Sequence, residues 1–581
     1  MVLIYLITGI VCSAYSQTNT NYGTGTVSIG ATNSFFGYYA GNDATASSAN
    51  NSFFGAYCGW NNTNGDNNSF FGSRSGFANT TGSSNTAIGD NAFNYNLTGS
   101  QNVAIGSYSL YQNNADQNTA VGNSSLMYNT TGDANAALGF SALFSNESGT
   151  SNTAVGASVL WRNTTGSENT AVGREALYGN ETGFHNTAVG FKALQINTES
   201  GNTAVGTKSL FKNTTGYSNT ANGHNALYEN TTGHYNVALG SNAMYLNVSG
   251  NFNMATGYYA LHANTTGIRN SAGGFRSMQG NTTGSNNTAK GAFALYNITT
   301  GSNNSALGYN AGPILGDLIN TTALGSQAVP TASNQVRVGN IAVTSIGGQV
   351  SWTTFSDGRF KKDIKEDVSG LDFINHLRPV SYVVDKTGLN KFLHVSDSSD
   401  NQEETRSTPM RQTGFLAQEV EEIVKKTGYV FYGVDAPKNE NDHYGIRYAE
   451  FVVPLVKAVQ ELSTKVEEQQ QQIQVLLAQL DSKSESDKKE GSGNTNATLL
   501  QNNPNPFNSE TEIKLTLSEN AGHAAIMIYS LEGKQMKNIP VYDHGDVSVK
   551  ISGNELSAGM YLYALIVDGK VVDTKRMILT Q

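Results

Sequence analysis

The stretch that sets the pattern of the first half reads Asn169-Thr170-Ala171-Val172-Gly173-Arg174-Glu175-Ala176-Leu177-Tyr178, and Gly179-Asn180-Glu181-Thr182-Gly183 follows it. The step Asn-Thr-Ala-Val-Gly and its variants recur eighteen times between Asn33 and Gly325. Successive motif glycines are 17 residues apart, except for three spacings of 16 or 18. A period this regular indicates a repeat protein.

A unit of 17 residues is too short for a helical hairpin or a propeller blade, and it fits two short strands joined by two tight turns. Gly and Asn supply the positive φ angles that such turns need. One unit cannot bury its small apolar steps, Ala-Val and Ala-Leu, whereas stacked rungs can. At about 4.8 Å per rung, the copies would form a rod of roughly 90 Å. The sequence therefore predicts a mainly β chain with a long parallel β-roll or solenoid.

The alternative is a disordered tract rich in Asn, Thr and Gly. A disordered tract would not keep Val, Ile, Leu or Phe in phase, yet the residue before the motif glycine is one of these in fourteen of eighteen copies. Two interpretations remain for the exceptions, axial polar layers that fix the register or loosened rungs, and we favour loosened rungs. The exceptions are Asn222, Thr256, Gly273 and Lys290.

One copy of the repeat reads Asn102-Val103-Ala104-Ile105-Gly106. It resembles the head repeats of trimeric autotransporter adhesins, which form a left-handed parallel β-roll, although the unit here is longer than theirs. The first three copies carry Phe35, Phe53 and Phe70 where later copies carry Ala. We expect a bulkier tip at that end.

Composition and charge argue against several classes of binding site. The net charge of −10 argues against a nucleic-acid partner, because phosphate binding needs a basic surface. Of the two cysteines, Cys12 lies in the predicted leader, which leaves Cys58 without an intrachain partner. The histidines are scattered singly, so we predict no metal site and no cofactor.

An enzymatic shaft is disfavoured. A glycosidase needs two carboxyl groups held a few ångströms apart, and the twelve Asp and Glu residues between Asn33 and Gly325 rarely recur in phase. The ladder of motif threonines suggests a surface that binds ice or glycans. Only one Thr recurs in each unit, however, which disfavours this function. A tailspike-like protein that binds or degrades glycans remains the alternative function.

The N-terminus is typical of a secretory signal peptide. Residues 2–11 are apolar and Ala14-Tyr15-Ser16 forms a small-x-small cleavage site. The apolar run is too short to span a membrane. We therefore predict export.

Three separated motifs follow the repeats: Ser356-Asp357-Gly358-Arg359-Phe360-Lys361-Lys362-Asp363-Ile364, Arg378-Pro379-Val380-Ser381-Tyr382 and Gly414-Phe415-Leu416-Ala417-Gln418-Glu419-Val420. Their order closely resembles the intramolecular chaperone domain of phage tailspikes and endosialidases. The resemblance implies a module that trimerises the chain and then cuts the bond between Phe355 and Ser356. It implies Ser356 as the nucleophile and Lys361 as its base. The supporting motif residues are Asp357, Arg359, Gln418 and Glu419.

The chemistry of such a pair is reasonable. A serine hydroxyl needs a base, and a lysine can serve when burial or nearby cations favour its neutral amine. Arg359 and Lys362 are such cations. The alternative is a chaperone that trimerises without cutting, so the only enzymatic activity predicted is serine–lysine endopeptidase activity on the chain itself.

An apolar seam follows the chaperone-like region. Its spacing of alternately 4 and 3 residues predicts a coiled coil, and the resemblance to the chaperone family implies that this coiled coil is trimeric. An amphipathic helix packed on its own domain is the alternative. The seam residues are Leu455, Val459, Leu462, Val466, Gln469, Ile473, Leu476 and Leu480.

Alternating apolar residues between Gly turns predict a C-terminal β-sandwich. The tail begins Asn503-Pro504-Asn505-Pro506-Phe507 and includes Leu556-Ser557-Ala558-Gly559-Met560-Tyr561. It closely resembles the type A sorting domain of the type IX secretion system of Bacteroidetes. A generic carbohydrate-binding sandwich is the alternative.

The predicted organisation is a signal peptide (1–16), a repeat shaft (17–325), a β connector (326–355), a chaperone domain (356–446), a coiled-coil helix (447–482), a flexible linker rich in Ser, Lys and Gly (483–498) and a sorting domain (499–581). These parts predict an exported homotrimeric surface fibre, adhesive or structural. Its predicted partners are the type IX secretion machinery and host or environmental glycans or surfaces. Its predicted location is extracellular or on the outer-membrane surface, after passage through the periplasm.

Overall fold

The computed structural model describes residues 20–23, 32–45, 47–314, 316–394, 411–487 and 497–580. The chain divides into two units, Met1–Lys457 and Ala458–Gln581. The predicted signal peptide lies outside the described residues. Among the helices that are described, none combines the length and the apolar character that a membrane crossing requires.

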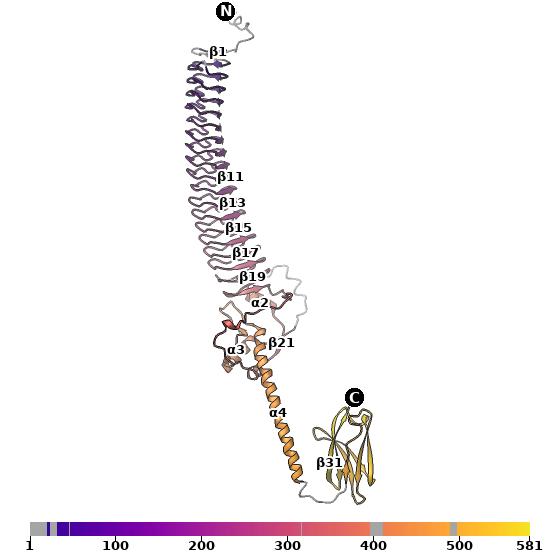
Figure 1. The fold of residues 1–581 in the computed structure, drawn as a ribbon. Coiled ribbons are helices and arrows are strands. Elements are labelled where there is room, and N and C mark those ends of the chain that lie inside the picture. The colour runs from indigo at the N-terminus through magenta and orange to yellow at the C-terminus, as the bar shows by residue number, and fades with distance from the viewer. Residues whose placement is uncertain are drawn as a thin grey trace, which may run out of the picture. The chain divides into compact units, whose positions relative to one another are not determined.

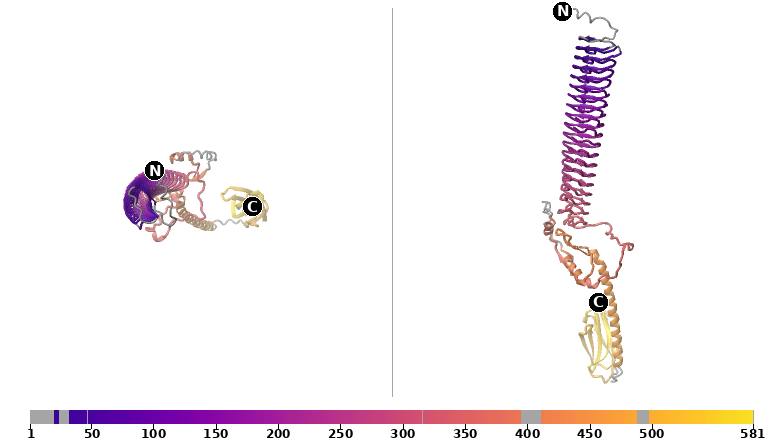
Figure 2. Two further views of the ribbon diagram at one scale, coloured as in Figure 1. Left: turned by 90° about the horizontal axis from the view of Figure 1, so that it is seen from above. Right: turned by 90° about the vertical axis from the view of Figure 1, so that its left-hand side faces the viewer.

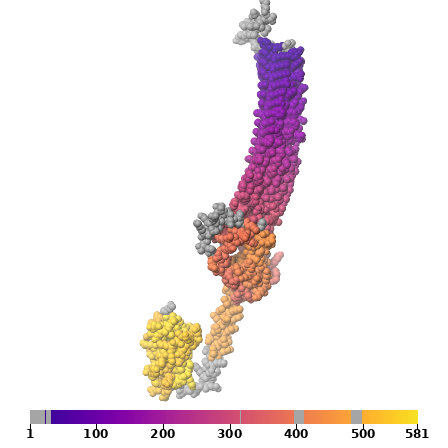
Figure 3. Space-filling model, turned by 180° about the vertical axis from the view of Figure 1, so that it is seen from behind, coloured from indigo at the N-terminus to yellow at the C-terminus, as the bar shows by residue number. Residues whose placement is uncertain are grey.

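The first unit is dominated by one parallel ladder of twenty short strands, called the shaft below (Figure 1). Equivalent residues pair in register, as when Thr170, Ala171 and Val172 lie opposite Thr187, Ala188 and Val189. From above, the rungs lie over one another (Figure 2), and the space-filling view shows them as one continuous surface (Figure 3). The parallel solenoid is thus confirmed, and one strand extends it beyond each end of the eighteen copies.

The strands of the shaft are β1 (Thr20–Tyr22), β2 (Ser34–Phe36), β3 (Ser52–Phe54), β4 (Ser69–Phe71), β5 (Thr86–Ile88), β6 (Val103–Ile105), β7 (Thr119–Val121), β8 (Ala136–Leu138), β9 (Thr153–Val155), β10 (Thr170–Val172), β11 (Thr187–Val189), β12 (Thr203–Val205), β13 (Thr220–Asn222), β14 (Val237–Leu239), β15 (Met254–Thr256), β16 (Ser271–Gly273), β17 (Thr288–Lys290), β18 (Ser305–Leu307), β19 (Thr322–Leu324) and β20 (Val336–Val338).

Each rung holds one strand of three residues rather than the two strands that we expected. The second apolar step, Ala176-Leu177, lies in a turn, and Glu175 and Leu177 have φ angles of 59° and 50°. Residues other than Gly seldom adopt this left-handed backbone conformation. The sequence pattern therefore did not reveal that this step forms a turn. Gly173, with φ 122°, is required for a further reason, because a Cβ there would lie 2.6 Å from the carbonyl oxygen of Gly190 in the next rung.

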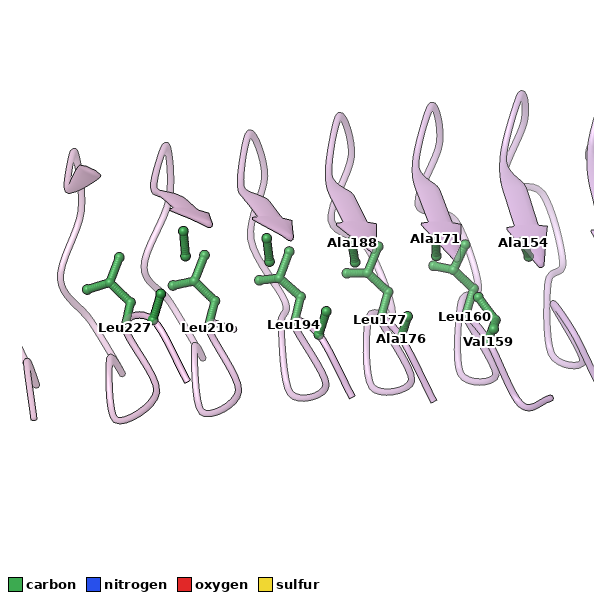
Figure 4. Close-up of a cluster of buried hydrophobic side chains, with 14 of the residues drawn as sticks. Ala154, Val159, Leu160, Ala171, Ala176, Leu177, Ala188, Leu194, Leu210 and Leu227 are labelled. Atoms are coloured by element: carbon green, nitrogen blue, oxygen red, sulfur yellow. The ribbon is translucent and has the colours of Figure 1, made fainter. Parts of the chain in front are cut away.

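The interior of the shaft is filled by small and aliphatic side chains from a single chain. Ala171, Ala176 and Leu177 are fully buried, and equivalent residues repeat above and below them (Figure 4). Stacking therefore buries what one unit cannot. Since the core closes within one chain, the shaft does not need a partner chain to complete it.

Two ladders of buried asparagines tie the rungs together. The Asn169 Nδ2 group donates to Asn152 Oδ1 at 3.1 Å and to the Gly183 carbonyl at 2.9 Å. In the turn, the Asn180 Nδ2 group donates to Asn163 Oδ1 at 3.0 Å. Asn163 and Asn180 are fully buried, so their side chains are used inside the turns.

The aromatic tip adds bulk both inside the shaft and on its surface. Phe35, Phe53 and Phe70 lie inside the shaft and are fully buried, with centroids of successive rings 4.9 Å apart. A Cβ on Gly59, which stands where later rungs carry Leu, would lie 2.5 Å from the Phe53 ring. The first Phe of each step has exchanged places with the leucine of later rungs, so this part of the added bulk points inward and fills the space of that leucine. The second Phe of each step lies on the outer side, and Phe71 is 39% exposed, so the surface there is bulkier as well.

The four exceptions to the aliphatic phase are not loosened rungs. Asn222, Thr256, Gly273 and Lys290 lie on the outer side of their strands, and the strands keep their register with both neighbours. The alanine beside each of them remains fully buried. The phased Val, Ile or Leu also faces outward, since the inward residue of each strand is the preceding Ala.

The rest of the first unit is a small α+β region that continues beyond the shaft. Its elements are η1 (Gly358–Phe360), α1 (Leu371–His376), β21 (Val380–Tyr382), α2 (Lys386–Phe392), β22 (Gln412–Gly414), α3 (Ala417–Thr427), β23 (Val434–Asp435), β24 (Gly445–Ile446) and η4 (Tyr448–Phe451). Helices α1 and α3 and the turn η4 supply its core of Phe373, Val420 and Phe451, and the region also contains two antiparallel strand pairs and helix α2.

A buried carboxylate joins this region to the last rung of the shaft. Asp442 Oδ1 accepts hydrogen bonds from Thr331 Oγ1 at 2.5 Å and Gln335 Nε2 at 3.2 Å. Burial by itself would raise the pKa of Asp442, but the hydrogen bonds from Thr331, the Lys438 amide and Gln335 outweigh burial and lower the pKa. The Asn439 side chain adds a bond to the Thr331 carbonyl.

Helix α4 (Val452–Asp487) begins directly after η4. Its seam residues are largely exposed in the single chain, with values of 64% for Val459, 56% for Ile473 and 62% for Leu480. Such exposure excludes the alternative in which this seam packs on its own domain. The coiled coil itself stays a prediction.

The second unit ends in a β-sandwich, as predicted. One sheet has the order β25-β26-β29 and the other β28-β27-β30-β31. Side chains from both sheets share one core, which includes Ile513, Ile526 and Tyr563. The elements are β25 (Thr498–Leu499), β26 (Glu510–Leu517), β27 (Ala524–Ser530), β28 (Gln535–Val541), β29 (Gly545–Ser552), η5 (Gly553–Glu555), β30 (Gly559–Val567) and β31 (Lys570–Leu579).

Candidate functional site

The predicted nucleophile and base lie next to each other. Asp357 caps the short helix η1, and its carboxylate accepts the Arg359 backbone N–H at 2.9 Å. The turn that follows brings Lys361 back toward the start of the motif, where its Nζ donates to Ser356 Oγ at 2.8 Å. The local geometry of one chain is therefore sufficient to assemble the Ser356–Lys361 pair.

The charge of Arg359 is paired within the motif. Its guanidinium binds the Asp357 carboxylate, with Nη2 and Oδ2 2.6 Å apart. The hydrogen bonds from Arg359 lower the pKa of Asp357, and those to Asp357 raise the pKa of Arg359. Arg359 and Asp357 thus shape the turn as a neutral pair, which differs from the role of a free cation beside Lys361 that we expected.

The bond predicted to be cut, between Phe355 and Ser356, is accessible in the single chain. Ser356 and Lys361 are exposed, and Phe355 on the other side of the bond is 72% exposed. The Phe355 and Phe360 rings lie 5.6 Å apart across the turn. An open pair in water lacks the dry surroundings in which catalytic groups act most strongly, so the single chain holds the parts of the site but does not enclose them.

The other two motif residues lie at the start of α3. Glu419 binds Arg378 through two hydrogen bonds, one of them 3.1 Å from Nε to Oε2. These bonds to Arg378 lower the pKa of Glu419. Gln418 lines a shallow depression of about 420 Å³ with Tyr382, Phe415 and other residues. In the described part of the chain, no hydrogen bond or ion pair joins Gln418 or Glu419 to Ser356 or Lys361.

The segment before the motif has no partner in the described residues. Residues 341–357 contain no strand, although we predicted a β connector that extends to residue 355. Large apolar side chains project from it and from the motif into solvent, including Val350 at 85%, Trp352 at 90% and Ile364 at 76% exposed. Exposed apolar groups gathered in one stretch are typical of an interaction surface. Sequence reasoning missed this surface, because exposure depends on what the fold leaves uncovered.

The match to known proteins begins at the serine itself. Residues 356–429 match the family described as the chaperone of endosialidase. The chaperone segment, as residues 356–429 are called below, therefore contains the Ser356–Lys361 pair, the Arg378–Glu419 pair and Gln418. Its core also uses Phe451, beyond the matched residues.

A second match covers the C-terminal sandwich. Residues 503–580 match the family described as the secretion system C-terminal sorting domain. This type IX sorting domain directs secretion to the cell surface or the extracellular space and implies an interaction with the type IX secretion machinery. No curated protein matches the chain. The chaperone segment and the sorting domain fit an exported, fibre-like β-solenoid protein.

Proposed function

We propose that the chain forms an exported homotrimeric surface fibre, in which the chaperone segment and α4 drive trimerisation and the chaperone segment then cuts before Ser356. The proposed parts keep the boundaries predicted from the sequence, with the shaft as the displayed rod. The observation that carries the proposal is the exposed heptad seam of α4. Seven of its eight residues are apolar and exposed, which is costly in water and is relieved when helices pack together.

The exposed residues around the cleavage site supply a second support. Trp352, Phe355 and Ile364 adjoin the Ser356–Lys361 pair and are mostly solvent-exposed. Neighbouring chains that cover them would also exclude water from the pair. Cutting would then depend on assembly, since enclosure strengthens each electrostatic interaction in the site.

The proposed cleavage reaction needs no reagent other than water. Ser356 Oγ attacks the Phe355 carbonyl carbon while Lys361 Nζ takes the hydroxyl proton. The C–N bond breaks, the amine of Ser356 receives that proton, and Phe355 is left as an ester on the Ser356 oxygen. Water hydrolyses the ester, which restores the hydroxyl and leaves Ser356 as a new N-terminus.

A mass measurement on the purified full-length chain tests the proposal. We expect three copies in the native state and a fragment that begins at Ser356. Ser356→Ala and Lys361→Ala should each abolish the fragment and keep the trimer, whereas Lys362→Ala is the matched control and should be cut. A folded monomer at micromolar concentration would disprove trimerisation, and cutting of Ser356→Ala would show that a foreign protease is responsible.

The glycan-degrading alternative loses support because several shaft carboxylates have structural uses. Asp133 Oδ1 accepts the Asp116 backbone N–H at 2.8 Å. Asp317 Oδ1 accepts the backbone N–H groups of Thr299 and Thr300 at 2.6 and 2.8 Å. Oxygens that hold the rungs together are poor candidates for acid–base catalysis. We keep glycan binding without hydrolysis, an adhesive role of the shaft, as the second proposed function.

A further inference from the structure

Exposed aromatic side chains gather at one corner of the shaft, in the turns that precede β13, β14 and β15. Figure 1 labels β13 and β15 on the shaft. Tyr217, Tyr235 and Phe252 are 37%, 47% and 50% exposed, and His234 lies half-buried among them. Single exposed apolar side chains are common on proteins, whereas a cluster of them marks an interaction site. These four residues define the aromatic corner. Other exposed aromatic side chains lie elsewhere on the shaft, for example Tyr95 and Phe184.

In several other rungs, the residue two positions before the motif Asn forms a hydrogen bond between neighbouring rungs. A Ser or Asp there accepts the backbone N–H of the preceding rung, as Ser100 Oγ accepts from Ser83 at 3.0 Å and Ser285 Oγ accepts from Ile268 at 3.1 Å. Tyr217 and His234 occupy this position, and among the described rungs neither side chain makes such a bond. The same hydrogen bond is also absent at other copies of this position within the described shaft, for example Phe184 and Ile268. What distinguishes the corner is that its rings are clustered and exposed.

The rings of the corner face two directions. Tyr217 and His234 are stacked with centroids 4.8 Å apart and planes within 5°. Tyr235 and Phe252 form a second stack at 5.3 Å and 14°. The two stacks stand nearly at right angles, 81° between His234 and Phe252. Apolar ring carbon is therefore presented in two orientations within three successive rungs.

A cation without a carboxylate partner adjoins the rings. The Arg269 guanidinium lies 6.0 Å from the centroid of the Phe252 ring, and its side chain is exposed. No ion pair involves Arg269 in the described residues, whereas Arg162 and Arg174 on the same shaft each have a glutamate. A guanidinium binds a carboxylate through two parallel N–H bonds. Arg269 is thus available for an anionic group that reaches the aromatic corner.

We propose that the aromatic corner and Arg269 bind a saccharide that carries a carboxylate, such as a chain of uronic acids. A sugar ring has a face of C–H bonds that packs on aromatic rings, and its hydroxyls bond to neutral polar groups such as those that surround the corner. The carboxylate binds the Arg269 fork. The proposal deepens the adhesive role proposed above by naming a ligand class and its place on the shaft.

The test uses the full-length chain and two pairs of oligosaccharides that differ in the carboxylate: oligogalacturonate against neutral galactan oligomers, and oligomannuronate against neutral mannan oligomers. Calorimetry should show that at least one acidic oligomer binds more tightly than its neutral counterpart. Tyr235→Ala combined with Phe252→Ala should weaken that binding roughly tenfold or more, a change of about 1.4 kcal/mol. Arg269→Gln should abolish the preference for the acidic oligomer, and added salt should weaken binding to the parent.

Two controls separate binding from folding and from assembly. Phe140, 59% exposed and without a ring contact among the described residues, is a matched exposed aromatic, and Phe140→Ala should leave binding unchanged. All variants should keep the melting temperature and native mass of the parent. Equal binding of acidic and neutral oligomers, no binding of either acidic oligomer, or unchanged binding by Arg269→Gln would overturn the proposal. The native mass reports the fibre proposal separately.

Discussion

Individual residues of the shaft are constrained by the volume of a closed interior. Most rungs combine Ala on the strand with Leu in the turn. The first three copies of the repeat, called the distal rungs here, carry Phe on the strand and Gly in the turn, as in Phe53 and Gly59. Both combinations fill the same space. Cores tolerate exchanges that preserve total volume far better than changes at one site, so the two positions should be coupled.

This coupling gives a testable prediction. Phe53→Ala should destabilise the distal rungs by about 3–5 kcal/mol, because it leaves a cavity between Phe35 and Phe70. Adding Gly59→Leu should recover most of that loss, since Leu177 shows that Leu tolerates this backbone conformation, with φ 50° against 58° for Gly59. Hydrogen exchange of the distal rungs is the measurement. Independent, additive effects of the two substitutions would contradict a shared interior.

Single residues also carry the candidate chemistry. The contact between Ser356 and Lys361 follows from a turn of six residues, in which Asp357 and Arg359 hold each other. Reactivity needs more than this contact, because both side chains face solvent in the single chain.

Between elements, the junction of the shaft with the α+β region that follows it depends on the ionised Asp442. Because its pKa is lowered in the folded state, the carboxylate contributes stability that is present above its unfolded pKa of about 3.9 and is lost as the pH falls through the folded value. We predict that the junction stays closed near neutrality and loosens in acid. Hydrogen exchange of residues 331–335, corrected for the intrinsic rate, should rise below about pH 4.

Asp442→Asn is the matched variant for the junction. It should loosen the junction at neutral pH and remove most of the acid dependence, because the titrating group is gone. Asp435→Asn, which removes the ion pair with Arg447, is the control and should keep the acid response of the parent. An unchanged acid response in Asp442→Asn would assign it to other groups.

At the scale of the whole molecule, the proposed cut conflicts with the route of export. The sorting domain follows Ser356 in the chain, so a cut before secretion would separate the shaft from its own signal. We predict that cutting follows passage of the outer membrane, since an assembled trimer is a poor substrate for a secretion pore and the pair should need assembly to act. Deletion of residues 499–581 should leave uncut protein inside the cell. Efficient cleavage before Ser356 in that retained protein would refute this order.

The sequence by itself determined the properties that repeat or that depend on local motifs. The motif glycines predicted the parallel solenoid, the alternation after Pro506 predicted the sandwich, and the order of motifs from Ser356 predicted the chaperone match. These features follow from neighbours in the chain, because turn conformation, strand alternation and short motifs are local. The heptad seam was visible in the same way, although its partner was not.

Only the tertiary structure decided which side of each strand faces inward and which groups have no partner. It placed Val172 outside and Ala171 inside, turned Leu177 inward through a left-handed turn, and placed Asn222 on the surface rather than in a loosened rung. It also brought Asp442 to Thr331, more than a hundred residues away in the chain, and left Trp352 in solvent. Burial and long-range contacts depend on how the rungs stack and on what they leave uncovered, and neither is encoded in the spacing of residues.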